Sequence, residues 1–301
     1  MFGVNYAGGK IAGSNKSDAT GVNIPTVSNN ISNVAKTDSS LTEDTNLSAS
    51  GKMDAEAVAT AALPAMVQLN GTTTVKSSSY FGYGQSYEAT SSGTGIIVGK
   101  SDTELLIVTN AHVVDNIDNL KCVFSDGTSA SCSVKGSKSD QDIAVAAVSL
   151  SDISSDTASN IAIAELEDSS DIKVGQQVVA IGNALGEGQS VTTGIISAKD
   201  RSITVNNVTF TGLLMTDAAI NSGNSGGALL NSEGKVIAIN FAKTSSDGVE
   251  GMAYSIPVSN VKDIIDSLMT KQTRNKVSSD KAAYLGIAAV DITSNYASYY
   301  G

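Results

Sequence analysis

The sequence is poor in metal-binding residues and in long apolar runs. Its 301 residues include one histidine and two cysteines. These are too few for a zinc-type ligand cluster, so neither a metal nor another cofactor is expected. No apolar run approaches the roughly 20 residues of a membrane-spanning helix, and no charged segment followed by an apolar one opens the chain. Because the sequence starts abruptly, we expect an export segment or membrane anchor upstream of Met1.

Positive charge is also scarce. The 19 Lys and Arg residues stand against 30 Asp and Glu residues, which gives a formal net charge of −11. Binding to nucleic acid backbones is driven by clustered Lys and Arg side chains that release counterions. This balance therefore excludes nucleic acid as a partner.

Tryptophan is absent, whereas glycine and short β-type runs are abundant. The chain has 28 glycines and is 41% hydrophobic. Runs of Val, Ile and Thr recur roughly every 10 residues with turn signals between them, which is typical of an all-β barrel or sandwich. Two helices are predicted, a short one that ends near Pro64 and an amphipathic one whose apolar stripe consists of Val261, Ile264, Ile265, Leu268 and Met269.

Composition divides the chain into four segments. Residues 1–52 are mostly Ser, Asn, Thr, Gly and Asp without a sustained apolar period, and they are predicted to be a disordered or linker segment. Residues 53–272 hold the strands and both helices. Residues 273–283 form a polar linker, and residues 284–301 begin an apolar unit that the sequence does not complete.

The two cysteines flank a predicted hairpin, KCVFSDGTSASC, in which Asp-Gly marks the turn. The apolar alternation puts Cys122 and Phe124 on the inner face of one strand, and Ala130 and Cys132 on that of the other. Pairing Phe124 with Ala130 would set Cys122 opposite Cys132. A disulfide worth about 2 to 3 kcal/mol would then be feasible and would imply an oxidising compartment. The alternative is two buried thiols that pack as small apolar groups.

Three residue types needed for acyl transfer occur in separate motifs. His112 follows a strong strand in TNAHVV, where residues 111–114 are expected to form one helical turn. Asp142 opens the strand DIAVAAV, and Ser225 lies in the glycine-rich segment NSGNSGG. A serine hydroxyl is a weak nucleophile until an imidazole takes its proton, and a carboxylate orients that imidazole and stabilises its charged form.

The glycines around the serine indicate how the backbone would assist. They would let the N–H groups of Gly223, Asn224 and Ser225 point at an oxygen that becomes negatively charged during the reaction. The same residues would also suit an ordinary surface turn between strands.

Five blocks of the sequence resemble, in order and spacing, the HtrA (Deg) family of trypsin-like serine proteases: TNAHVV, DIAV, VVAIGNALGEGQSVTTGIISA, TDAAINSGNSGGALLNSEGKVIAIN and AYSIPVSNVKDII. The resemblance covers about residues 53–272. It implies an all-β, chymotrypsin/trypsin-like double six-stranded β-barrel, with His112 as general base, Asp142 as orienting carboxylate and Ser225 as nucleophile between the barrels. Asp140 is a rival, but the family's aspartate directly precedes Ile-Ala, as Asp142 does.

The resemblance extends to the substrate. In trypsin-like proteases the residue six before the serine lies at the base of the specificity pocket, and here it is Ala219, next to Ile220. An apolar pocket predicts cleavage after small or medium aliphatic residues, because burying an unpaired cation costs several kcal/mol. Asn240, Phe241 and Ala242 would offer a strand edge for an extended chain. The predicted substrates are unfolded or misfolded proteins, as in protein quality control.

The resemblance also implies features outside the catalytic centre. Residues 284–287, YLGI, resemble the start of a peptide-binding PDZ domain. Family members tend to form trimers, and an aromatic loop is either a contact in a homotrimer or packs within itself: Tyr80, Phe81, Tyr83 and Tyr87. The predicted location is extracytoplasmic, in a bacterium.

Two other functions stay open. A holdase or binding module on the same fold would have a resting-state disordered active site, with residues 200–212 and 243–250 as switch loops. An esterase-like hydrolase would use GNSGG as its nucleophile elbow. That elbow requires a helix after the serine and a histidine late in the chain, whereas strands are predicted here and His112 comes first.

Overall fold

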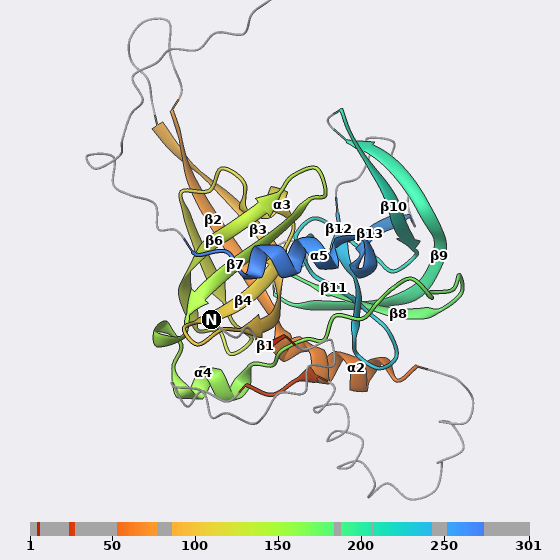
Figure 1. The fold of residues 1–301 in the computed structure, drawn as a ribbon, viewed down its shortest axis with the longest axis horizontal. Helices are drawn as coiled ribbons and strands as arrows, with labels where there is room; N and C mark the ends of the chain where they lie inside the picture. Colours follow the sequence, from red (N-terminus) through yellow and green to blue (C-terminus); the bar gives the residue numbers. More distant parts are fainter. Residues whose placement is uncertain are drawn as a thin grey trace, which may run out of the picture.

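The computed structural model describes residues 5–6, 24–27, 53–76, 86–183, 188–205, 207–242 and 252–273. Two β-structures lie side by side, and one helix crosses the junction between them (Figure 1). Within the described residues, no helix has the length and apolar character needed to cross a bilayer.

The N-terminal sheet contains seven strands in the order β1-β3-β2-β5-β6-β7-β4. An additional pairing between β3 and β4 closes the six strands from β2 through β7 into a ring. The strands are β1 (Asn5–Tyr6), β2 (Met66–Lys76), β3 (Ser86–Lys100), β4 (Glu104–Thr109), β5 (Asn119–Val123), β6 (Ser129–Lys138) and β7 (Ile143–Ser149).

The C-terminal strands form a closed barrel in the order β10-β13-β12-β11-β8-β9. They are β8 (Gln177–Gly182), β9 (Ser190–Val205), β10 (Val208–Thr216), β11 (Ala228–Leu230), β12 (Val236–Phe241) and β13 (Ala253–Pro257). The predicted all-β, double-barrel fold is therefore confirmed.

Helices are few and short. α2 (Ala55–Ala62) is capped by the Asp54 carboxylate, which accepts from the N–H of Ala57, and it ends in the 3₁₀ turn Leu63–Ala65 that contains Pro64. α3 (Ala111–Val114) is the predicted single turn. After the 3₁₀ turn Leu150–Asp152 comes α4 (Ser155–Asn160), which is too polar to show an apolar period and was not predicted.

Helix α5 (Val258–Met269) connects the two barrels. It packs on β6 and β7 of one barrel and on β12 and β13 of the other (Figure 1). Of its predicted apolar stripe, Val261, Ile265, Leu268 and Met269 are buried and Ile264 is half-buried. These side chains join one apolar core that contains residues of both barrels, so the helix holds the junction together.

Part of the predicted N-terminal linker is ordered, which differs from the prediction for residues 1–52. Val27 is fully buried in the core, its N–H donates to the carbonyl of Ile163, and the N–H of Ile163 donates to the carbonyl of Pro25. A run of four residues, IPTV, is too short for a periodicity argument, so only its tertiary contact reveals it. The predicted PDZ start at residues 284–301 lies outside the described residues.

The predicted disulfide is wrong. Cys122 pairs with Ala130 and Cys132 with Leu120, a register two residues from the expected one. Side chains diagonal to one another in a sheet lie about 7 to 8 Å apart, beyond the roughly 3.5 to 4.5 Å between the Cβ atoms of a disulfide. Both cysteines are free, buried thiols. The oxidising compartment loses this support.

The turn explains the register. The N–H of Phe124 donates to the carbonyl of Thr128, and the Asp126 carboxylate accepts from both the N–H and the hydroxyl of Thr128. The hairpin therefore closes closer to its turn than the apolar alternation suggested. An even shift leaves the faces unchanged, so the predicted burial of both cysteines holds.

Candidate active site

His112 and Asp142 meet at the junction of α3 and β7. The Nδ1 atom of His112 lies 2.7 Å from Oδ2 of Asp142, and the backbone N–H of His112 donates to Oδ1 of the same carboxylate at 2.9 Å. The Asp142 side chain is 2% exposed and the His112 side chain 25% exposed. Both carboxylate oxygens thus fix the histidine, whose Nε2 is the ring nitrogen not used in this contact.

The rival carboxylate, Asp140, takes no part. Its side chain is 58% exposed and forms an ion pair with Lys138 at 3.1 Å. Asp142 lies two residues further on, in a left-handed backbone conformation with φ of 52°. Its carbonyl accepts from the Asn110 side-chain amide at 2.9 Å, which ties the turn to the residue before α3.

The glycine-rich segment between β10 and β11 is a tight loop. Gly223 and Gly226 have φ of 95° and 81°, a region that favours glycine. A Cβ atom at Gly226 would lie 2.3 Å from the carbonyl oxygen of Thr94 and 2.2 Å from Oγ1 of Thr109. Only glycine lets the loop approach β3 and β4 this closely, so the segment is not an ordinary surface turn.

The end of β12 contacts both Ser225 and His112. The N–H of Ala242 lies 3.3 Å from the Oγ atom of Ser225, and the ring of Phe241, one residue earlier, packs edge-on against the His112 ring at 6.3 Å between centroids. Two successive residues therefore contact the serine hydroxyl and the imidazole. Ser225 is buried, with only 6% of its surface exposed.

Two backbone donors in the loop are available to a ligand. The N–H groups of Gly223 and Ser225 donate to no acceptor among the described residues. The N–H of Asn224 donates to the carbonyl of Asn221 at 3.0 Å, so Asn224 does not belong in the predicted set of oxyanion donors.

The predicted substrate-pocket residues fall into two groups. Ile220 and Ala242 belong to one apolar cluster, with exposed Ala219 next to it. Phe241 packs on Phe210 at 5.0 Å between ring centroids and fills the core instead of a pocket.

Asn240 does not belong to the predicted free strand edge, because its hydrogen-bonding groups are used within the protein. Its N–H donates to Gly227, its carbonyl accepts from Gly226, and its side-chain amide donates to the carbonyls of Ile181 and Ala228. Its main-chain groups are therefore already used, and the free edge can begin only after it.

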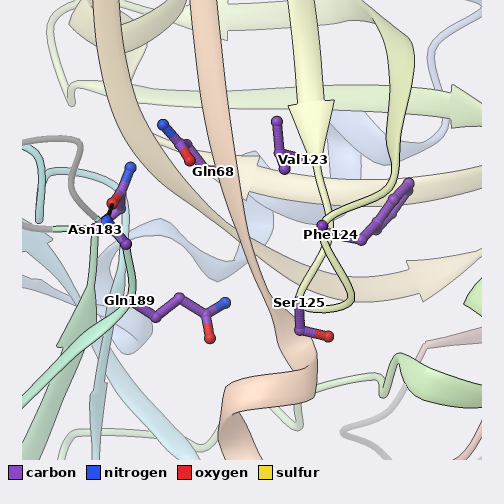
Figure 2. A pocket seen from close by; sticks show the side chains of 8 residues that line it. Gln68, Val123, Phe124, Ser125, Asn183 and Gln189 are labelled. Atoms are coloured by element: carbon purple, nitrogen blue, oxygen red, sulfur yellow. Dashed lines mark hydrogen bonds between the residues drawn. The ribbon is translucent and has the colours of Figure 1, made fainter.

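Sequence reasoning missed a pocket of about 200 Å³ that is lined by residues of both barrels. Figure 2 shows that its lining comes from β2, from the β5–β6 turn and from the segment between β8 and β9: Gln68, Val123, Phe124, Ser125, Gly127, Asn183, Gly188 and Gln189. Asn183 is buried, and its side-chain nitrogen has no hydrogen-bond partner among the residues that the structure describes. Three segments far apart in sequence build this pocket, and the motifs in two of them, the cysteine hairpin and the block that begins VVAIGN, do not predict that the segments meet.

Metal ligands do not gather in the part of the chain that the structure describes, where no three His, Cys, Asp or Glu side chains are placed to hold an ion. Burial raises the pKa of the Cys132 thiol to about 12 and, together with the neighbouring Cys132, raises the pKa of Cys122 well above its usual value. Both thiols are therefore protonated and unreactive at neutral pH.

Comparison with known proteins defines the class first. The model of the trypsin-like peptidase domain matches residues 93–239, which run from β3 to β12 and include His112, Asp142 and Ser225. Together with the two barrels, this match places the chain among the trypsin-like peptidases.

The chain belongs to the HtrA family of these proteases, which confirms the resemblance seen in the sequence. It is 36% identical over 238 residues to the serine protease Do-like HtrA of Bacillus subtilis, covering 76% of this chain and 50% of that protein. It is 36% identical over 216 residues to the periplasmic serine endoprotease DegP of Salmonella typhimurium, covering 71% and 42%. The chain thus spans half or less of the length of these relatives.

Solved structures of HtrA-type proteases are also similar to this chain, in agreement with the family assignment. A variant of the HtrA-type protease AlgW with a decapeptide is similar with a TM-score of 0.62 and 31% identity, covering 72% of this chain and 67% of that one. AlgW with a tripeptide is similar with a TM-score of 0.59 and 31% identity, covering 72% and 64%.

Proposed function

We propose that this chain is a serine endopeptidase in which His112 is the general base, Asp142 the orienting carboxylate and Ser225 the nucleophile. The observation that carries the proposal is the double contact of the buried Asp142 carboxylate with Nδ1 and the backbone N–H of His112. This contact directs the proton of the neutral imidazole to Nδ1 and leaves the Nε2 lone pair free to accept one.

The reaction would begin when Oγ of Ser225 attacks the carbonyl carbon of a peptide bond and its proton passes to Nε2 of His112. The N–H groups of Gly223 and Ser225 would bind the negative oxygen of the tetrahedral intermediate. His112 would then protonate the leaving amine as the C–N bond breaks, which leaves an acyl-enzyme. Water would then attack the ester carbonyl while its proton passes to Nε2 of His112. His112 would return that proton to Oγ of Ser225 as the C–O bond to the serine breaks, which releases the acid and regenerates Ser225.

The predicted specificity rests on Ala219, Ile220 and Ala242. Ile220 and Ala242 share an apolar cluster and Ala219 is exposed beside it, so a small or medium aliphatic side chain would fit best. A substrate strand would pair with the chain after Asn240, where hydrogen bonds to the backbone read little sequence. Unfolded or misfolded proteins expose such strands, which supports a role in quality control.

The location and assembly are also proposed. DegP relatives are named periplasmic, which supports an extracytoplasmic site in a bacterium. Of the aromatic residues suggested as contacts in a homotrimer, Tyr87 on β3 is 58% exposed, and Tyr80, Phe81 and Tyr83 lie outside the described residues. Light scattering of the purified chain tests the trimer, and a monomer at all concentrations would contradict it.

The test of the activity compares wild-type protein with Ser225→Ala. We expect a fluorophosphonate probe to label wild type at Ser225 and wild type alone to degrade casein. Mapped cleavage sites should follow Val, Ala or similar residues, whereas sites after Lys or Arg would contradict the proposed pocket.

The same test separates the alternatives. Labelling without proteolysis would favour an esterase, although the segment after Ser225 is strand β11 and not the helix that an esterase elbow requires. If wild-type protein shows no labelling and no proteolysis, the result would favour the holdase. The comparisons with known proteins do not support that alternative.

A further inference from the structure

Thr94 of β3 connects the N-terminal sheet to the loop that carries Ser225. The residue is 1% exposed. Its hydroxyl donates to the carbonyl of Gly223 at 2.8 Å and accepts from the N–H of Asn183 at 2.8 Å. Its backbone N–H donates to the carbonyl of Ser225 at 2.9 Å. One side chain and one N–H thus bind two carbonyls of the loop.

These two carbonyls belong to Gly223 and Ser225, whose N–H groups have no acceptor among the described residues. The C=O groups of Gly223 and Ser225 each accept a hydrogen bond from Thr94, and within the described part of the chain their N–H groups donate to no acceptor. The peptide that follows Gly223 is held at both ends, since its C=O binds Thr94 and its N–H, that of Asn224, binds Asn221. With this plane fixed, the direction of the Gly223 N–H depends only on the φ and ψ angles of Gly223 itself.

Glycine makes this restraint necessary. Gly223 has no side chain to restrict its backbone, so an unanchored residue at this position would sample many φ values. Stabilising a developing charge requires donors that are already aimed, because reorienting them during the reaction costs free energy. The Thr94 hydroxyl is the side-chain group that supplies the anchor.

We propose that Thr94 is a positioning residue that aims the N–H of Gly223 at the oxyanion. It touches no substrate, and its role rests on the proposed function of the loop as an oxyanion site. A group that acts only on the intermediate should affect kcat and leave substrate binding unchanged.

The test uses the full chain with Thr94→Val, which keeps the shape and removes the hydroxyl, and Thr94→Ser, which restores it. We expect Thr94→Val to lower kcat by about 10- to 100-fold, less than the roughly 100- to 1000-fold lost with an oxyanion donor, and to leave KM within about twofold. Thr94→Ser should recover most of the loss. A peptide boronate, which forms a charged tetrahedral adduct with serine, should bind Thr94→Val more weakly by the same factor as kcat/KM.

Thr157→Val is the matched control for stability. Thr157 is also buried, and its hydroxyl contacts two hydroxyls, those of Thr128 and Ser154, away from the site. Thr157→Val should lower the melting temperature about as much as Thr94→Val does, but its kcat should equal that of wild type. If folded Thr94→Val has the kcat and the boronate affinity of wild type, the proposed role of Thr94 is wrong. The same follows if Thr94→Ser loses as much kcat as Thr94→Val. Absence of cleavage by wild-type protein would instead overturn the proposed function itself.

Discussion

At the scale of single residues, the backbone of Asp142 is held in an uncommon conformation. A φ of 52° places it in the left-handed region, which costs most side chains about 1 to 2 kcal/mol and Asp somewhat less. The hydrogen bond from the Asn110 side chain to its carbonyl helps to hold this conformation. The result is a buried carboxylate whose two oxygens both face His112.

Replacing Asp142 tests this arrangement. Asp142→Asn keeps the size but can place an N–H₂ group against Nδ1, which favours the wrong tautomer of His112. We expect kcat to fall about 10⁴-fold with little change in KM. Asp140→Asn is the control and should retain wild-type kcat, because Asp140 is exposed and forms an ion pair with Lys138, away from His112. A large loss in both variants would contradict the assignment of Asp142.

Two glycines with the same φ of 81° separate conformational strain from crowding. A Cβ atom would meet nothing within 4 Å at Gly127 but would lie 2.3 Å from the Thr94 carbonyl oxygen at Gly226. Gly127→Ala should therefore cost about 1 to 2 kcal/mol of unfolding free energy, the left-handed penalty alone. Gly226→Ala should cost more and abolish fluorophosphonate labelling of Ser225. Urea unfolding measures the loss of stability in each variant, and fluorophosphonate labelling measures the reactivity of Ser225. Equal effects of Gly127→Ala and Gly226→Ala on both would contradict the crowding argument.

At the scale of elements, the β5–β6 hairpin buries two thiols without bonding them. Both thiols have pKa values raised above the usual 9.0, that of Cys132 to about 12, chiefly because burial disfavours the thiolate. Between these pH values the folded state binds more protons than the unfolded state. The free energy of unfolding contributed by the thiols is therefore fully present below pH 9 and is lost as the pH rises toward 12.

A double variant tests this pH dependence. Cys122→Val with Cys132→Val keeps the apolar volume and removes the titrating groups. We expect the urea midpoint of wild type to fall more steeply above pH 9 than that of the double variant. If the urea midpoints of wild type and the double variant fall in parallel above pH 9, the thiols do not cause the loss of stability. Titration of unfolded, unreduced wild type should find both thiols free.

At the scale of the whole molecule, α5 and the shared core make the two barrels one unit. Ile265 on α5 is fully buried in that core, whereas its neighbour Ile264 is half-buried. Ile265→Ala should lower the free energy of unfolding by about 2 to 5 kcal/mol, and Ile264→Ala by clearly less. Both should unfold in one transition, measured by near-UV and far-UV circular dichroism. Two separated transitions would contradict a single cooperative core.

Local patterns predicted much of this structure. Strand runs, the apolar stripe of α5 and the turn at residues 111–114 are properties of short windows, so the sequence reveals them directly. The resemblance to the family also selected Asp142, the carboxylate that contacts His112, over Asp140. The apolar alternation named the buried faces of the cysteine hairpin, because faces depend only on residue parity.

The sequence by itself therefore determined an all-β chain with an amphipathic C-terminal helix, and its resemblance to the family implied the double barrel and named His112, Asp142 and Ser225 as the residues now proposed for the site. Only the tertiary structure decided the cysteine register, the burial of Asn240, the docking of Val27 and the contact of Thr94 with Gly223. The physical reason is range. Periodicity and motifs act within a few residues, whereas register follows from how a turn closes, and contacts between barrels arise only when distant segments pack together.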